Sequence, residues 1–254
     1  KIFVWILLFL LVINVIAALI TVFRKPRSIS SVLAWMMTLI FLPGIGFIIY
    51  LFCGRGIDGQ EVFKLSDDEK QMVQRIKEKV DVDNKKAGRD KRYDLLYDAK
   101  VLNRYFRNMD ASPLAKRNSL QLFTDGQEKF QALFEDIRAA KETVHVEYYA
   151  FFNDTIGNQF LDVLIEKLHE GVEVYLIYDP WGSPGANKKF FARYVDAGGK
   201  VAPFITSRDM IRKTRLNYHL HRKIVVIDGK IGWTGGFNVG DQYLNVTEKF
   251  GYWR

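Results

Sequence analysis

Cysteine, histidine and acidic residues are scarce in this sequence, and each shortage narrows what the protein can do. The single cysteine, Cys53, excludes a disulfide within the chain and a metal cluster built from cysteines. Only four histidines are present. The 29 acidic residues are outnumbered by 37 lysines and arginines, which gives a formal net charge of +8. That charge suits a protein that works beside anionic lipid headgroups or one that binds nucleic acid, and charge alone does not choose between them.

Two long apolar runs occupy the amino-terminal part of the chain. Residues 2–23 contain only Asn14 and Thr21 as polar side chains, so the run is long enough for a membrane span and longer than the apolar region of a cleaved secretory signal. The second run, residues 32–52, is interrupted only by Thr38, Pro43, Gly44 and Gly46. Membrane helices tolerate such interruptions. The sequence therefore predicts a transmembrane helical hairpin over residues 1–53.

The sidedness of this hairpin is left open by the charges around it. The loop between the two runs carries Arg24, Lys25 and Arg27, and a literal positive-inside count places this loop in the cytoplasm and the large domain outside. Basic residues also follow the second run, among them Arg55 and Lys64. The loop and the segment after the second run both favour the cytoplasm, although a hairpin of two spans places them on opposite sides of the membrane.

A charged helical linker near the membrane is predicted over residues 54–117. Ser66 and Glu69 form a capping-box signal, and apolar residues recur at helical spacing from there to Val80. The polar segment that follows has the mixed charge of a linker, and a second helical pattern covers residues 93–108.

Strand and helix patterns alternate from residue 118 onward. This order predicts an α/β layered domain with parallel strands over residues 118–254. Asp228-Gly229 is a strong hairpin signal between the last two strands. The expected strands are residues 119–123, 143–152, 172–179, 200–205, 222–228 and 230–236, and the expected helices are residues 127–140, 156–169 and 188–197.

The segment HLHRK holds the candidate chemistry. In a strand, residues two apart point to the same face, so His219, His221 and Lys223 are expected to project together. Two imidazoles at one face could bind a divalent metal, but the ammonium of Lys223 would repel a dication and attract a phosphate. The face therefore favours an anion, with a histidine as nucleophile or proton donor.

A glycine-rich segment follows this strand. Gly235 and Gly236 let a backbone approach a ligand closely, and Asn238 offers an amide donor to the oxygens of a phosphoryl group. The nearby basic run from Arg208 to Arg215 would deepen the positive field around an anionic substrate.

Together these residues form a specific motif. His221, Lys223 and Asp228 fit HxKxxxxD, and GGxN follows six residues later, so the chain resembles the phospholipase D superfamily. The segments EYYAFFND, GVEVYLIYD and Gly182-Ser183 continue the resemblance upstream. The second apolar run is similar to the amino-terminal region of bacterial cardiolipin synthases. The resemblance implies a phospholipase D-like α/β/α layered domain behind a two-helix transmembrane hairpin.

Roles for individual residues are implied by this resemblance. His221 is expected to be the nucleophile or the proton donor at the phosphodiester, with Lys223 and Asn238 on its oxygens. Asp228 belongs to the motif but is also the first residue of a hairpin turn. Glu147 matches an acidic residue that could orient a histidine. His219 either lines the pocket or packs structurally.

The implied activity is a membrane-bound cardiolipin synthase. Such an enzyme transfers a phosphatidyl group between two phosphatidylglycerol molecules through a phosphatidyl-histidine intermediate and releases glycerol, with no metal or other cofactor. Its expected location is a bacterial cell membrane, crossed twice. A membrane-tethered phosphodiesterase or nuclease is the alternative, although the chain lacks the aromatic and basic interleaving of single-strand binders, and no nucleic-acid partner is expected. An inactive membrane scaffold is a third reading.

The chain departs from the superfamily in one respect. One active site is built from two such motifs, yet only His221 is followed two residues later by lysine. We therefore expect this chain to be the amino-terminal half of a longer enzyme, with its first phospholipase D-like domain truncated after Arg254. A homodimer in which each subunit gives one motif is the weaker option.

Overall fold

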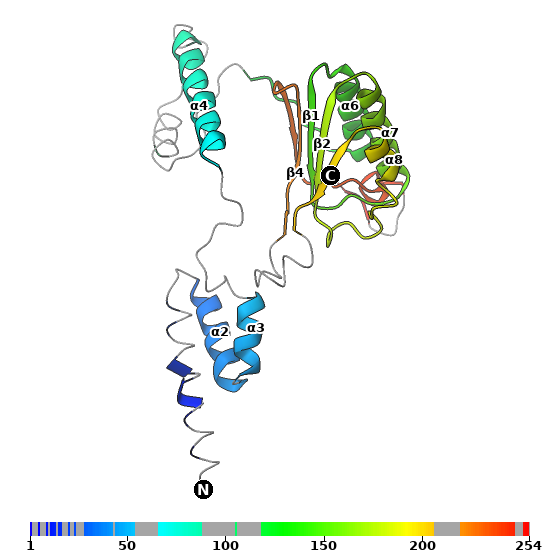
Figure 1. Cartoon of the computed structure of the whole chain (residues 1–254). Coiled ribbons are helices and arrows are strands. Elements are labelled where there is room, and N and C mark those ends of the chain that lie inside the picture. Colours follow the sequence, from blue (N-terminus) through cyan, green and yellow to red (C-terminus); the bar gives the residue numbers. More distant parts are fainter. Residues whose placement is uncertain are drawn as a thin grey trace. The chain divides into compact units, whose positions relative to one another are not determined.

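The computed structural model describes residues 28–42, 44–53, 66–87, 118–205, 219–246 and 251–253, together with Tyr105 and isolated positions before residue 28 (Figure 1). These residues belong to two compact units. One consists of residues 1–58 and 123–254, and the other of residues 59–122. The basic run from Arg208 to Arg215 lies outside the described residues.

The second apolar run forms two helices instead of the one span that was predicted. Helix α2 (Ile29–Phe41) begins at Ser28, whose side chain accepts a hydrogen bond from the Ser31 N–H. The chain then turns at Gly44, which has a φ of 80°, before α3 (Ile45–Cys53) begins. Glycine adopts this left-handed conformation at little cost, and this is why the helix breaks here. In the part of the chain that the structure describes, no helix is long and apolar enough to cross a membrane.

The linker contains one long described helix, α4 (Asp67–Ala87). Its capping box is confirmed, because the Ser66 N–H donates to Glu69 Oε2 at 2.6 Å and the Glu69 N–H donates to Ser66 Oγ at 3.3 Å. The helix extends beyond the predicted end near residue 80. The predicted helix at residues 93–108 lies outside the described residues apart from Tyr105.

The sheet that follows is mixed, with strand order β3-β2-β1-β4-β5. β1 (Thr143–Tyr148), β2 (Glu173–Tyr178) and β3 (Lys200–Pro203) are parallel, as predicted. β4 (Lys223–Ile227) runs antiparallel to both β1 and β5 (Ile231–Thr234). The predicted hairpin joins β4 to β5. Its turn residues Asp228 and Gly229 both have positive φ values, 50° and 63°, as a two-residue hairpin of this kind requires.

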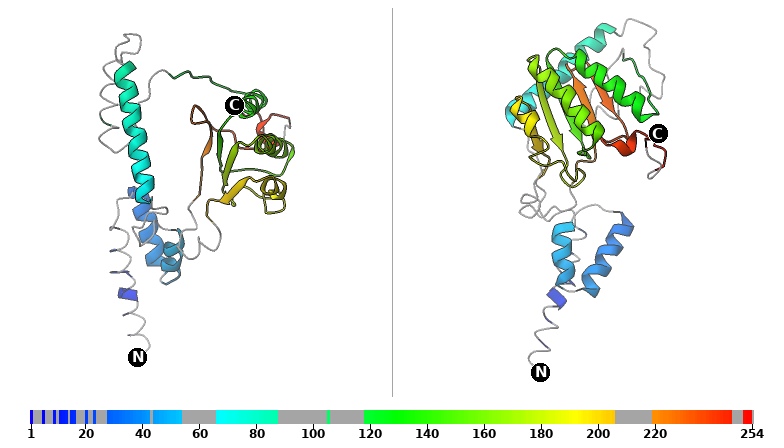
Figure 2. Two further views of the ribbon diagram at one scale, coloured as in Figure 1. Left: turned by 45° about the horizontal axis from the view of Figure 1, so that its top comes forward. Right: turned by 90° about the vertical axis from the view of Figure 1, so that its right-hand side faces the viewer.

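Three helices pack on one face of the sheet: α6 (Gly126–Ala139), α7 (Thr155–His169) and the short α8 (Ala192–Asp196) (Figures 1 and 2). The alternating apolar residues of β1, β2 and β4 are buried beneath them, including Val144, Val146, Val174, Leu176, Val225 and Ile227. The opposite face carries exposed or half-buried side chains such as His145 and Ile177. The second helical layer of the predicted α/β/α arrangement is not found among the described residues.

Two predicted elements differ from the structure. Residues 119–123 form no strand, and Leu120 and Leu122 are exposed. The Phe123 ring stacks on the Trp233 ring. The predicted strand 143–152 ends at Tyr148, and its last residues turn away to pair Phe151 with Val239. A short apolar run can satisfy a strand pattern without having a partner strand.

Candidate active site

The candidate site lies at the end of the sheet where the parallel strands β1 and β2 finish. Tyr149 follows β1, Asp179 follows β2, and His221 lies two residues before the start of β4. Continuing the β4–β5 register by one residue from the pair Ile224 and Thr234 brings Gly235 opposite Lys223. The carboxyl ends of parallel strands are where α/β sheets hold their ligands.

His221 and Lys223 come together, although not on one strand as predicted. Nζ of Lys223 lies 3.4 Å from Nε2 of His221. The backbone forms a three-residue turn before β4, in which the Arg222 N–H donates to the Leu220 carbonyl at 2.8 Å. The His221 side chain is therefore exposed at the mouth of the site, whereas Lys223 is only 8% exposed.

An aromatic side chain completes the surroundings of this pair. The Tyr149 ring is 4.7 Å from the His221 ring, and Nζ of Lys223 is 5.3 Å from the Tyr149 ring centre. Tyr149 is held in place by its own N–H, which donates to the Arg222 carbonyl at 2.8 Å. The ring limits access of water to the ammonium from one side and offers it a cation–π contact.

The electrostatics of the pair favour an anion. Burial lowers the pKa of Lys223 because the charged ammonium loses water contacts. A nearby negative charge would reverse that loss, since it stabilises the ammonium form. When Nε2 of His221 carries no proton, it can accept a hydrogen bond from the Lys223 ammonium. A phosphate placed beside both groups would accept that hydrogen bond instead. The lone pair of Nε2 would then be available to attack the phosphorus.

Asp179 is a buried residue of the candidate site that the sequence analysis did not single out. Its side chain is buried at 1% exposure, and one oxygen, Oδ2, accepts the Leu220 N–H at 2.8 Å and lies 3.4 Å from His219 Nδ1. The other oxygen accepts the Trp181 N–H at 2.9 Å. Asp179 thereby fixes the segment that leads into His221. The sequence could have indicated this residue, because it directly follows a predicted buried strand. Ligands of α/β sheets bind at the carboxyl ends of parallel strands.

His219 is placed by this carboxylate and by two aromatic rings. Its ring centre is 6.4 Å from that of Tyr149 and 6.0 Å from that of Trp181. Both of its predicted readings, pocket lining and structural packing, fit this location at the rim of the site.

The glycine-rich segment is partly open and partly buried. A side chain at Gly235 or Gly236 would meet no atom within 4 Å, so the surface beside Lys223 is open there. Asn238 is only 5% exposed: its Oδ1 accepts the Ala150 N–H at 3.1 Å, and its Nδ2 donates to the Tyr243 hydroxyl at 2.6 Å. Direct binding of phosphate by Asn238 stays a prediction, and in the structure the residue ties the loop after β5 to the end of β1.

Asp228 lies away from His221 and Lys223, and its contacts favour a structural role over the predicted catalytic one. It follows β4 at the end opposite Lys223, about 17 Å away along the strand at about 3.3 Å per residue. Its carboxylate accepts the N–H groups of Lys141, Glu142 and Thr143 at 2.9, 2.8 and 2.9 Å, and these bonds lower its pKa. Asp228 therefore joins the β4–β5 turn to the start of β1.

The predicted role of Glu147 in orienting a histidine stays a prediction. Glu147 lies on β1 next to Tyr148 and therefore on the opposite face of the sheet, away from the buried Lys223. The ion pair that the structure gives it is with Arg222, at 3.9 Å.

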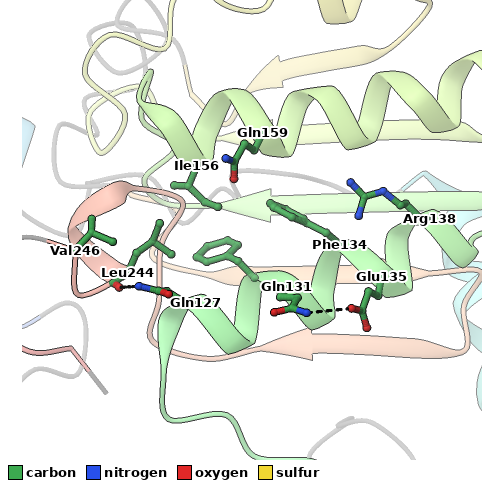
Figure 3. Close-up of a pocket in the computed structure, with 10 residues that line it drawn as sticks. Gln127, Gln131, Phe134, Glu135, Arg138, Ile156, Gln159, Leu244 and Val246 are labelled. Atoms are coloured by element: carbon green, nitrogen blue, oxygen red, sulfur yellow. Dashed lines mark hydrogen bonds between the residues drawn. The ribbon is translucent and has the colours of Figure 1, made fainter.

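A groove of 520 Å³ lies elsewhere, along α6 and α7 (Figure 3). Its polar lining includes Gln131, Glu135 and Arg138, and its apolar lining includes Phe134 and Leu244. None of the predicted site residues lines it. Nor does any group of three or more histidine, cysteine, aspartate or glutamate side chains suited to a metal ion occur in the described ranges.

Known proteins match this chain over most of its length. Residues 133–249 match the family model described as cardiolipin synthase, PLD-like domain. Residues 133–249 are therefore similar to the phospholipase D-like domain of cardiolipin synthases. Residues 12–55 of the same chain match a second family model, described as phospholipase D-nuclease N-terminal, ahead of the phospholipase D-like domain.

The relatives of this phospholipase D-like chain are about twice its length. A cardiolipin synthase of Listeria monocytogenes is 40% identical over 98% of the chain, which covers 52% of that protein. A cardiolipin synthase of Staphylococcus aureus is 39% identical over 96% of the chain and 49% of that protein. The chain thus spans about half the length of the curated relatives that it matches.

Solved structures also match the phospholipase D-like part. NucT from Helicobacter pylori has 21% identity and a TM-score of 0.36, over 48% of this chain and 73% of that chain. Nuc from Salmonella typhimurium, a phospholipase D family member, has 18% identity and a TM-score of 0.37, over 46% and 68%.

Proposed function

We propose that this chain supplies the first histidine–lysine motif of a membrane-bound cardiolipin synthase, which transfers a phosphatidyl group between two phosphatidylglycerol molecules. The observation that carries the proposal is the 3.4 Å contact between a buried ammonium, Lys223, and an exposed imidazole, His221. The names of the relatives at 40% identity supply the substrate class.

In the proposed first step, Nε2 of His221 attacks the phosphorus of phosphatidylglycerol. A P–N bond forms while the bond between phosphorus and the glycerol oxygen breaks, and that oxygen takes a proton from an acid as glycerol leaves. Lys223 stabilises the negative charge that gathers on the non-bridging oxygens. The phosphatidyl-histidine keeps the energy of the phosphodiester, so no nucleotide is consumed.

In the second step a glycerol hydroxyl of another phosphatidylglycerol attacks the same phosphorus. The P–N bond breaks, the hydroxyl proton passes to a base, and cardiolipin leaves. The acid and base are assigned to a second histidine, in the remainder of a longer protein or in another subunit. Water would compete for the intermediate, which gives an advantage to a site beside the bilayer.

The membrane anchor of this enzyme is assigned to residues 1–53. The apolar run at residues 2–23 has the length of a span, and the arginines and lysine that follow suit an anionic lipid surface. The second span predicted from sequence is reconsidered in the next subsection.

The activity can be tested with the full-length protein and phosphatidylglycerol in mixed micelles. Cardiolipin and free glycerol in equal amounts are the expected products, with no loss of rate in a chelator. Phosphatidic acid without cardiolipin would identify a phospholipase instead, and cleavage of added DNA would identify a nuclease.

The nucleophile can be tested by rapid quenching in denaturant at alkaline pH, where the acid-labile P–N bond survives, during turnover of phosphatidylglycerol labelled with ³²P. We expect the label on His221 or on the histidine of the second motif, and we expect His221→Ala to abolish cardiolipin formation while the protein stays in the membrane fraction. Cardiolipin formation at the wild-type rate by His221→Ala would overturn the assignment.

A further inference from the structure

We propose that α2 and α3 form a re-entrant hairpin, which enters the bilayer and returns to the same side instead of crossing it. This inference rests on the membrane anchoring proposed above and changes its topology. In this arrangement, lipid hydrocarbon covers the outer surface of the two helices. Residues 24–28 and the phospholipase D-like domain lie on the same side of the membrane.

The two helices pack against each other in opposite directions. Figures 1 and 2 show α2 and α3 side by side. The Trp35 and Tyr50 rings make an edge-to-face contact at 4.9 Å, and Gly46 lies against Thr38. In both pairs an increase in residue number along α2 is matched by a decrease along α3, which is the arrangement of an antiparallel hairpin. Leu39 and Tyr50 are 0% and 1% exposed, so the hairpin has a small core of its own.

Gly46 makes this close packing possible. A β-carbon at this position would lie 2.5 Å from the carbonyl oxygen of Thr38, a backbone atom that cannot move away without separating the helices. Small residues at such crossings are the usual means of close helix packing in membranes. In one continuous helix the same glycine would have no such neighbour.

The outer surface of the hairpin is apolar on all sides. No charged residue or histidine occurs from Ser28 to Cys53. The exposed large side chains include Leu33, Met37, Phe41, Ile45 and Ile48, at 56%, 58%, 71%, 63% and 57% exposure. Water would disfavour so dense a group of apolar side chains, whereas hydrocarbon would cover them at no cost. The hydroxyl of Thr38 is satisfied internally, because it donates to the Ala34 carbonyl at 2.8 Å.

The lengths of the helices favour entry and return. The 13 residues of α2 and the 9 residues of α3 extend about 20 and 14 Å at about 1.5 Å per residue, against a hydrocarbon core of about 30 Å. With the turn at Gly44 deepest in the bilayer, both open ends reach the same headgroup layer.

Charge complementarity supports lipid as the occupant and decides the side. Arg24, Lys25 and Arg27 precede the hairpin and Arg55 follows it, so both open ends carry cations that suit anionic headgroups. In a spanning arrangement these two groups of cations would lie on opposite sides. In the re-entrant arrangement they act together, and the positive-inside tendency places both flanks in the cytoplasm.

Sidedness can be measured with single cysteines, because Cys53 is the only cysteine in the 254 residues. In a Cys53→Ser background, with any cysteine beyond these residues also replaced, cysteine is introduced by Ser28→Cys, Arg55→Cys or Ala139→Cys. These positions report the start of the hairpin, its end and the phospholipase D-like domain. Each variant of the full-length protein is treated with a membrane-impermeant maleimide, in intact cells and after permeabilisation.

We expect all three positions to be protected in intact cells and labelled after permeabilisation. Labelling of Ser28→Cys and Arg55→Cys from opposite sides would overturn the re-entrant hairpin and restore a full span. The assay does not depend on lipid synthesis, so an active enzyme with opposite sidedness would disprove this inference and leave the proposed function standing.

A second variant pair tests the packing at Gly46. Gly46→Leu is expected to separate α2 from α3 and to change the labelling of Arg55→Cys, whereas the exposed Ile48→Leu is expected to leave it unchanged. Identical labelling of Arg55→Cys in the Gly46→Leu and Ile48→Leu proteins would also count against the hairpin.

Discussion

The strongest test of how the site is built is the substitution Asp179→Asn. The two side chains have nearly the same shape, so the change removes charge and one acceptor without leaving a cavity. Asp179 uses both oxygens: Oδ2 accepts the Leu220 N–H at 2.8 Å, and Oδ1 accepts those of Trp181 and Gly182 at 2.9 and 3.3 Å. In whichever way an asparagine amide is turned, its NH₂ group faces a backbone N–H.

The expected cost in folding free energy is about 1.5–3 kcal/mol, the usual range for losing a buried hydrogen bond to a charged group. The effect on turnover has a separate cause. Leu220 directly precedes His221, so a displaced Leu220 N–H shifts the imidazole against Lys223. A displacement of about 1 Å in a catalytic group can slow a reaction by about 100-fold, and we expect kcat to fall 10- to 100-fold with little change in KM.

Asp228→Asn is the matched control. Asp228 makes the same kind of contact, a carboxylate that accepts three backbone N–H groups, at the other end of β4. Both variants should lower the midpoint of denaturant unfolding, and only Asp179→Asn should lower kcat per folded molecule. Equal kcat values in the two variants, with both proteins folded, would refute the positioning role of Asp179.

Two further predictions concern buried lysines. Lys223→Met keeps the length of the side chain but removes its charge. We expect kcat/KM for phosphatidylglycerol to fall by about 100- to 1000-fold, the usual effect of losing one donor that stabilises an oxyanion. A loss below about 10-fold would contradict the role of Lys223. Burial lowers the pKa of Lys129 to about 7, so between pH 7 and 9 the unfolded chain binds more protons than the folded one. The free energy of unfolding should therefore rise by about 2 kcal/mol over this range, at up to about 1.36 kcal/mol per pH unit. Lys129→Met should flatten this rise in denaturant titrations at several pH values, and an unchanged slope would exclude Lys129 as its source.

The sequence predicted local features well where neighbouring residues decide them. The capping box of Ser66 and Glu69 and the hairpin at Asp228-Gly229 depend on contacts within a few positions or on turn geometry. By contrast, the segment at residues 119–123 has a strand pattern but no partner strand, and no local signal reports that. The second apolar run contains Pro43 and Gly44, where the helix breaks, but no local signal reports that Gly46 packs against Thr38.

By itself, the sequence determined the chemistry of this protein: an imidazole and an ammonium two residues apart, a glycine-rich segment after them, and an apolar amino-terminal region. Residue types and spacings carry that information because side-chain chemistry does not depend on the fold. Only the tertiary structure decided which residues meet. Asp179 accepts a hydrogen bond from Leu220, which is 41 positions away in sequence. Asp228 belongs to the motif, yet it lies at the opposite end of β4 from Lys223. A motif gives distance along the chain, whereas catalysis depends on distance in space.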